Sequence, residues 1–204
     1  LAASRPRYPT VAERYLTLVS RLFPAFGSPG RDAVARVLLD DPAYESVAAY
    51  KALYETTRRV VGRGQTPYAA VLALESWFRQ RGDFTYDESP PVVRGQPPLV
   101  AFVNRTRAGY CQHYAGAMAL MLRMLGIPAR VAVGFTSGTL EDGKWIVSDH
   151  EAHAWVEVWF EGQGWVPFDP TPGRGTFGGR YSFASDSEQA VAALIDTDRP
   201  IRSF

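Results

Sequence analysis

Residues 152–160 alternate strictly between two kinds of side chain, as expected of a β-strand with one face buried. One face collects the small and apolar side chains, which are Ala152, Ala154, Val156, Val158 and Phe160. The other face collects His153, Trp155, Glu157 and Trp159. Gly162 and Gly164 mark a turn, and residues 165–169 are a return strand that ends before Pro170. The pattern predicts an antiparallel hairpin.

Helical patterns surround this hairpin, so we predict an α+β fold. One helix start is Thr66-Pro67, with threonine at the N-cap and proline at the first helical position, and this helix should run to about Arg81. A second helix, residues 112–125, is apolar around much of its circumference and ends at Gly126 and Pro128. The other expected helices are residues 10–22, 31–39, 44–61 and, weakly, 186–195. The other expected strands are residues 84–86, 131–135 and 145–147.

Cys111 is the only cysteine of the chain, and it directly precedes the apolar helix 112–125. Unpaired N–H groups and the helix dipole at such a position favour a thiolate. A lone cysteine is more often an inert buried residue. The glycine turn at Gly109, the helix start, and a histidine and an aspartate on strands that can pair favour a nucleophile instead.

The hairpin brings a histidine and a carboxylate together. If it turns through residues 160–162, Trp159 pairs with Gln163 and His153 lies opposite Asp169, with Cβ atoms about 5 Å apart. Thiol, imidazole and carboxylate form the set that covalent acyl transfer needs. We therefore expect Cys111 as nucleophile, His153 as base and Asp169 as the residue that orients the imidazole.

The same reasoning suggests residues around the reacting carbonyl. The backbone N–H of Cys111 is the natural first oxyanion donor. Asn104, Gln112 and the hydroxyl of Tyr110 are open alternatives for the second donor. Tyr110, Gln112 and Trp155 are the expected residues of a substrate cleft.

Four blocks of sequence resemble the transglutaminase-like superfamily of papain-type cysteine enzymes. The blocks are residues 109–115, 125–131, 153–158 and 164–171. The resemblance implies the same Cys-His-Asp triad and an antiparallel sheet packed on the nucleophile-bearing helix. It also implies acyl transfer through a thioester at an amide, from a glutamine side chain or a peptide bond, to water or to an amine such as that of lysine. The bacterial pattern has glutamate after the cysteine, where this chain has Gln112.

The resemblance also bears on organisation and location. We expect a helical extension at residues 1–65, a catalytic core at 66–175 and a C-terminal loop with a short helix at 176–204. Bacterial members often carry this domain outside the cytoplasm and joined to membrane helices. The chain begins at Leu1, and we expect it to be part of a longer membrane-anchored protein.

Other readings of the same residues remain open. His150 and His153 could suggest a zinc site, but residues three apart on a strand point to opposite faces, and we expect no metal. A cysteine peptidase, a non-catalytic module that binds peptide or glycan, and transfer from an acyl-coenzyme A donor are also possible. We expect most of the strand tryptophans to pack in the core, His150 to be exposed, and His113 to be a packing or hydrogen-bonding residue.

The composition of the chain argues against several classes of binding partner and site. Lys and Arg total 22 against 21 Asp and Glu, for a net charge of +1, which argues against a nucleic-acid partner. No run of about 18 apolar residues is present to form a membrane helix. One cysteine excludes an internal disulfide and any CxxC metal site. The expected chemistry requires no cofactor.

Overall fold

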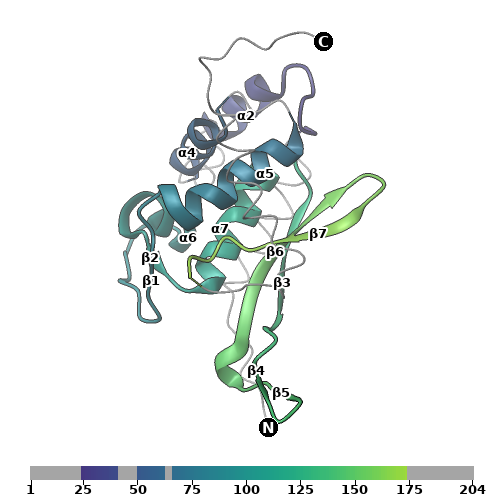
Figure 1. Ribbon diagram of the computed structural model, residues 1–204. Helices are drawn as coiled ribbons and strands as arrows, with labels where there is room; N and C mark the ends of the chain where they lie inside the picture. Colours follow the sequence, from purple (N-terminus) through teal and green to yellow (C-terminus); the bar gives the residue numbers. More distant parts are fainter. Residues whose placement is uncertain (1–23, 41–49, 63–65, 174–204) are drawn as a thin grey trace.

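Helices and an antiparallel sheet pack on opposite sides of one central helix, as the computed structural model shows for residues 24–40, 50–62 and 66–173 (Figure 1). The predicted α+β class is confirmed. The α-helices are α2 (Arg31–Asp40), α4 (Lys51–Val61), α5 (Pro67–Ser76), α6 (Pro98–Ala101) and α7 (Cys111–Met124). Shorter helical segments are η2 (Trp77–Arg81), η3 (Phe102–Thr106) and η4 (Asp149–Glu151). The strands are β1 (Thr85–Tyr86), β2 (Ala108–Gly109), β3 (Ala129–Phe135), β4 (Thr139–Glu141), β5 (Lys144–Ile146), β6 (Ala152–Phe160) and β7 (Gly164–Phe168).

Helix α5 begins as predicted from the Thr66-Pro67 pair. The Thr66 Oγ1 atom accepts a hydrogen bond of 3.1 Å from the Ala69 N–H, and Pro67 occupies the first helical position. The expected helix to Arg81 is present as α5 followed by the π-helical segment η2. This helical unit, together with α4 and α6, packs against α7.

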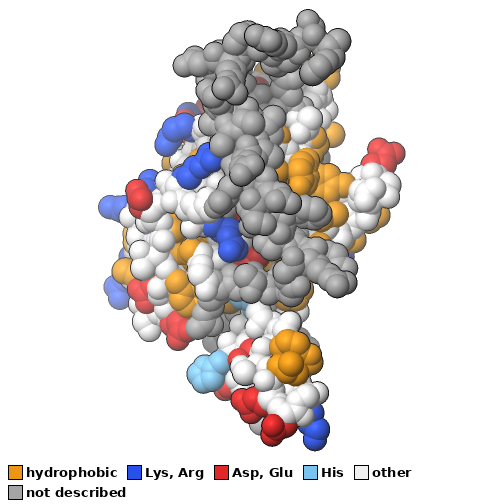
Figure 2. Space-filling model, in the orientation of Figure 1, with side chains coloured by type: hydrophobic (Ala, Val, Ile, Leu, Met, Phe, Trp, Pro, Cys, Tyr) orange, Lys and Arg blue, Asp and Glu red, His pale blue; other side chains and the backbone are white. Residues whose placement is uncertain are grey.

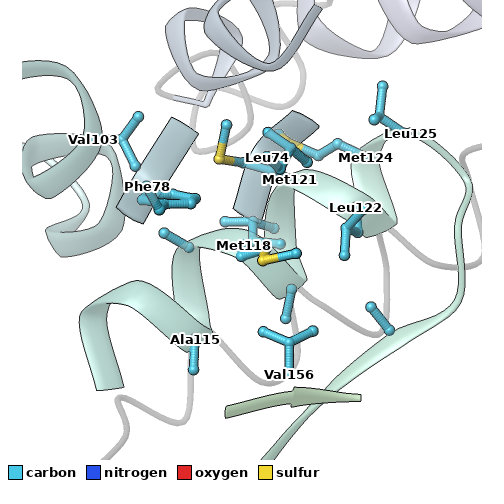
Figure 3. Close-up of a cluster of buried hydrophobic side chains, with 14 of the residues drawn as sticks. Leu74, Phe78, Val103, Ala115, Met118, Met121, Leu122, Met124, Leu125 and Val156 are labelled. Carbon is cyan, nitrogen blue, oxygen red and sulfur yellow. The ribbon is translucent and has the colours of Figure 1, made fainter. Parts of the chain in front are cut away.

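Helix α7 is the centre of the core. Its side chains are buried on nearly every side, which explains the apolar composition of all its faces. Leu74 and Phe78 of the α5–η2 unit pack on one side of it, and Val156 of β6 lies on the other (Figure 3). The helix ends at Gly126, whose φ of 74° allows the Ile127 N–H to donate to the Leu122 carbonyl at 3.0 Å.

The main sheet has the strand order β3-β6-β7, and both pairs are antiparallel. The predicted hairpin is present, but its register is not the expected one. Trp159 pairs with Trp165 rather than with Gln163, because the turn uses residues 161–163 and Phe160 pairs with Gly164. The turn has three residues, as we assumed, but it lies one position further along the chain, with Gly162 at its centre at a φ of 77°.

The expectation that the strand tryptophans fill the core is wrong for three of the four. Trp145, Trp159 and Trp165 are 61%, 45% and 38% exposed. The rings of Trp159 and Trp165 contact each other at 5.5 Å on the outer surface of the hairpin, where the Arg130 guanidinium lies 4.0 Å from the centre of the Trp165 ring. Large side chains at alternate strand positions therefore cover the solvent side of the sheet here.

The turn predicted at residues 141–144 is present in a second hairpin, β4–β5. This hairpin lies beyond the end of the main sheet (Figure 1). Leu140 and Trp145 are both more than half exposed on it. Apolar atoms on the surface of this lower end are visible in Figure 2.

The helices that precede residue 66 pack onto the rest of the described structure. The guanidinium of Arg31 in α2 donates to the Met124 carbonyl at the end of α7, and the Phe26 N–H donates to the Gly126 carbonyl at 3.2 Å. Helix α4 contacts both α5 and α7. The predicted helices at residues 10–22 and 186–195, and residues 44–49 of a third, lie outside the described residues. The domain division at residues 65 and 175 stays a prediction.

The structure adds a helical segment that the sequence reading left unassigned. Helix α6 and segment η3 occupy residues 98–106, and Arg107 follows with a φ of 49°. This reversal leads into β2, which pairs in parallel with β1, and β2 leads directly to Cys111. Within the described ranges no helix is both long and apolar enough to cross a bilayer.

Candidate active site

Cys111 is the first residue of α7, as predicted. Tyr110 before it has an extended backbone with φ of −112° and ψ of 177°, and serves as the N-cap. The N–H of a first helical residue has no acceptor within the helix, so it is free to face a ligand. The thiol belongs to a residue that is only 9% exposed, at the end of the buried helix.

The approach to Cys111 leaves no room for a side chain at Gly109. A Cβ atom there would lie 2.9 Å from both Cβ and Cγ of His113 and 3.0 Å from the Phe102 ring. The glycine that the sequence reading took as a turn signal is therefore required by close packing at the helix start.

His113 has a capping role at the same helix start. The Tyr110 N–H donates to Nδ1 of His113 over 3.5 Å, and the two rings are 4.5 Å apart. Burial lowers the pKa of His113, which keeps the ring neutral and able to accept this hydrogen bond. The expectation that His113 packs and makes hydrogen bonds is confirmed.

His153 and Asp169 meet in the structure. Nε2 of His153 is 2.8 Å from Oδ2 of Asp169, and each residue is only 5% exposed. His153 lies on β6, and Asp169 directly follows the last residue of β7. With Nε2 engaged, Nδ1 is the ring nitrogen that remains for a second partner.

The second partner of His153 is the Cys111 side chain. Burial alone lowers the pKa of His153, but the hydrogen bonds to Asp169 and Cys111 outweigh it and raise the pKa to about 9. The structure therefore brings together the three residues that the sequence reading selected. Their arrangement favours a protonated imidazole between a carboxylate and a sulfur atom.

Sequence reasoning missed two residues that surround Asp169. The Asp169 N–H donates to Oε1 of Glu75 at 2.9 Å, and the Asp169 carbonyl accepts from Nη1 of Arg79 at 2.8 Å. Glu75 is the only charged residue of α5. A single carboxylate in an otherwise apolar helix is the signal that could have identified it.

The remaining predicted site residues are less closely tied to the triad. Asn104 accepts from the Thr56 hydroxyl at 2.9 Å and lines a cavity of about 530 Å³ between α4, η2 and η3. No triad residue lines that cavity, and the role of Asn104 as the second oxyanion donor stays a prediction. Tyr110 and Gln112 flank Cys111 in the chain, and their roles, like that of Trp155 in a cleft, stay predictions.

Metal ligation finds no support in the described residues. His150 is exposed in η4, as expected, while His153 is buried against Asp169. Across the described ranges, no group of three or more His, Cys, Asp or Glu side chains is arranged to hold a metal ion.

Comparison with known proteins identifies the family. Residues 54–170, more than half of the chain, match the model of the transglutaminase-like superfamily. The chain belongs to this superfamily. A Pseudomonas aeruginosa protein-glutamine gamma-glutamyltransferase is 44% identical over 135 residues, which are 63% of this chain and 20% of that protein. A Bacillus subtilis protein, YebA, is 40% identical over 111 residues, which are 50% of this chain and 15% of YebA.

A solved structure supports the same conclusion at the level of the fold. The periplasmic domain of TgpA from P. aeruginosa superposes with a TM-score of 0.55 at 32% identity, covering 78% of this chain and 51% of that one. The transglutaminase-like core that the four sequence blocks implied is therefore confirmed. The chain spans about a fifth of the P. aeruginosa gamma-glutamyltransferase, so the activity of any whole protein is a matter for proposal.

Proposed function

We propose that this domain is a cysteine acyltransferase that acts on amides through a thioester, with a glutamine side chain of a protein or peptide as the acyl donor. The observation that carries the proposal is the position of His153, whose Nε2 lies 2.8 Å from Oδ2 of Asp169 and whose pKa is raised by interactions with both Asp169 and Cys111. The similarity to a protein-glutamine gamma-glutamyltransferase supports the choice of donor.

The proposed first half-reaction forms the thioester. Nδ1 of His153 takes the proton of the Cys111 thiol, and Asp169 stabilises the resulting imidazolium. The thiolate then adds to the carbonyl carbon of the amide, and the Cys111 N–H at the start of α7 donates to the oxyanion. When the C–N bond breaks, the imidazolium gives its proton to the nitrogen, and ammonia leaves.

The proposed second half-reaction restores the thiol. A lysine amine or a water molecule gives a proton to the neutral His153 as it adds to the thioester carbonyl. The C–S bond breaks, and the Cys111 sulfur recovers the proton from the imidazolium. An amine acceptor gives a cross-link, and water gives deamidation.

The location follows from the same comparison. We propose that the domain works outside the cytoplasm as part of a longer, membrane-anchored bacterial protein. The support is the similarity to a periplasmic domain, together with the small share of the relatives that the chain covers.

Ammonia release from a glutamine-containing peptide tests the proposed activity. We expect release by the wild-type domain, none above background by Cys111→Ala, and a mass-spectrometric adduct on Cys111 equal to the peptide minus ammonia. Peptide-bond cleavage without ammonia release would favour a cysteine peptidase instead. Equal ammonia release by Cys111→Ala would exclude Cys111 as the nucleophile.

Alkylation separates an enzyme from a binding module. A thiolate held beside an imidazolium reacts with iodoacetamide well below the pKa of about 8.5 of a free cysteine. An inert thiol in a binding module would react only above that pH.

A further inference from the structure

The main chain of Asp169 is not held by the sheet. The last pair of the β6–β7 ladder joins Val156 to Phe168, and Asp169 is the next residue. Its carboxylate nevertheless makes a 2.8 Å hydrogen bond to His153. Some other part of the molecule must therefore fix the position from which this carboxylate reaches the imidazole.

Two side chains of the α5–η2 unit hold the backbone of Asp169. Glu75 accepts the Asp169 N–H at 2.9 Å, and Nη1 of Arg79 donates to the Asp169 carbonyl at 2.8 Å. The two residues are four apart, so they lie on the same side of the helical unit. Both peptide groups that flank the Asp169 Cα atom are thus fixed from one direction.

Arg79 and the turn after Asp169 complete the arrangement. The same Nη1 atom lies 3.2 Å from the Thr171 carbonyl, and the Thr171 N–H donates to Oδ1 of Asp169 at 2.9 Å. One carboxylate oxygen is therefore used by the turn, which leaves Oδ2 for His153. Each hydrogen-bonding group of Asp169 has a named partner, and two of these partners come from the α5–η2 unit.

The placement of Glu75 carries an energetic penalty that an apolar residue would avoid. Burial raises its pKa to about 7, even though the Asp169 N–H and the nearby Arg79 act in the opposite direction. All other residues of α5 are uncharged. A glutamate that is unfavourable for stability, and whose oxygen contacts a residue of the triad, points to a role in the site.

We propose that Glu75 and Arg79 are positioning residues, which clamp the main chain of Asp169 so that its carboxylate stays on His153. The inference rests on the proposed function, because it assigns these residues to the triad of that reaction. Neither residue takes part in bond formation. Their removal should act through the orientation of Asp169 and hence through the protonation of His153 and the reactivity of Cys111.

The test measures the rate of Cys111 alkylation by iodoacetamide as a function of pH, which needs no knowledge of the substrate. Glu75→Gln and Glu75→Met have similar lengths, but only glutamine keeps an oxygen that can accept the Asp169 N–H. We expect Glu75→Met to lower the rate near neutral pH by about tenfold or more and to move the profile toward that of a free thiol. Glu75→Gln should stay within about twofold of the wild type, since the hydrogen bond survives.

Arg79 has a matched control in the same segment. Arg81 also lies in η2 and is exposed, and its side chain makes no ion pair or hydrogen bond with the described residues. Arg79→Met should slow alkylation as Glu75→Met does, whereas Arg81→Met should leave it unchanged. Circular dichroism shows whether Glu75→Met folds. If it does not, the comparison of Arg79→Met with Arg81→Met tests the proposal instead.

Asp169→Ala, which removes the oxygen that accepts the His153 N–H, separates failure of this inference from failure of the proposed function. If Asp169→Ala slows alkylation but Glu75→Met and Arg79→Met react like the wild type, the proposed role of Glu75 and Arg79 is wrong and the triad stands. If Asp169→Ala itself has no effect, both the proposed triad and the positioning role are wrong. A Glu75→Gln variant as slow as Glu75→Met would also overturn the hydrogen-bond clamp.

Discussion

Asp169 meets His153 on the diagonal of the β6–β7 hairpin rather than directly across it. Extending the observed register past Phe168 would put Thr171 opposite His153, yet the hydrogen bond of 2.8 Å joins His153 to Asp169. A displacement of two residues keeps a side chain on the same face of a sheet, whereas a displacement of one reverses it. The expected contact therefore survived an error in the predicted register.

The protonation of the three histidines can be measured directly. The chain contains only His113, His150 and His153, so their ring signals can be followed by NMR during a pH titration. We expect His153 to titrate near pH 9, because Asp169 and Cys111 stabilise its charged form, and His113 to titrate below its ordinary value. In Asp169→Asn the pKa of His153 should fall. An unchanged value in that variant would contradict the assigned cause.

Signals from neighbouring residues in the sequence were sufficient to predict where several helices and strands begin and end. The Thr66-Pro67 pair predicts the start of α5, and Gly126 predicts the end of α7, because capping chemistry involves only neighbouring residues. The alternation of residues 152–160 gives β6 with its observed bounds. The candidate triad could be selected because each member lies at a recognisable position of such an element.

The missed features depend on contacts between distant segments. Glu75 and Asp169 are 94 positions apart, and no local pattern indicates that a helix side chain accepts from a backbone N–H beyond a strand. The register of the hairpin depends on where its three-residue turn begins, and a turn over residues 160–162 or over residues 161–163 includes Gly162 in either case. The exposed tryptophans show that size alone does not decide which face of a strand is buried.

Two aromatic residues should differ sharply in their contribution to stability. Phe78 is 1% exposed and contacts the rings of Phe84, Phe102 and Tyr114, so Phe78→Ala should lower the free energy of unfolding by about 3–5 kcal/mol. Trp165 is 38% exposed, and Trp165→Ala should cost about 1 kcal/mol from its contacts with Trp159 and Arg130. Urea unfolding of both variants checks this. An equal loss of unfolding free energy in the two variants would mean that Trp165 is packed as tightly as a core residue.

Two glycines test the packing of the segment before α2 on the end of α7. Gly126 and Gly143 have φ values of 74° and 75°, so alanine introduces similar backbone strain at both. A Cβ atom at Gly126 would also collide with the Pro24 carbonyl oxygen and lie 2.8 Å from the Phe26 nitrogen, whereas none of the described atoms is within 4 Å at Gly143. We expect Gly126→Ala to cost about 3 kcal/mol and Gly143→Ala about 1 kcal/mol. Similar melting temperatures for the two variants would contradict this packing.

The raised pKa of Glu75 predicts a pH-dependent difference in stability. Its pKa is about 7 in the folded protein and near its ordinary 4.5 in the unfolded chain. A raised pKa means that the folded state favours the protonated carboxyl. The contribution of Glu75 to the free energy of unfolding is therefore largest below about pH 4.5 and is lost as the pH rises through 7. Glutamine cannot ionise, so Glu75→Gln lacks this pH dependence. The pH dependence from all other carboxyl groups is the same in both proteins and cancels when the two are compared.

The free energy of unfolding of Glu75→Gln minus that of the wild type should therefore rise between about pH 4.5 and 8. A shift of the Glu75 pKa from 4.5 to about 7 corresponds to a change in the free energy of unfolding on the order of 3 kcal/mol. Urea unfolding of both proteins at the two ends of that range measures this difference. A constant difference between Glu75→Gln and the wild type would mean that Glu75 is solvated as in the unfolded chain. The variant should be the more stable protein at high pH because it removes a partly buried charge and keeps the hydrogen bond to Asp169.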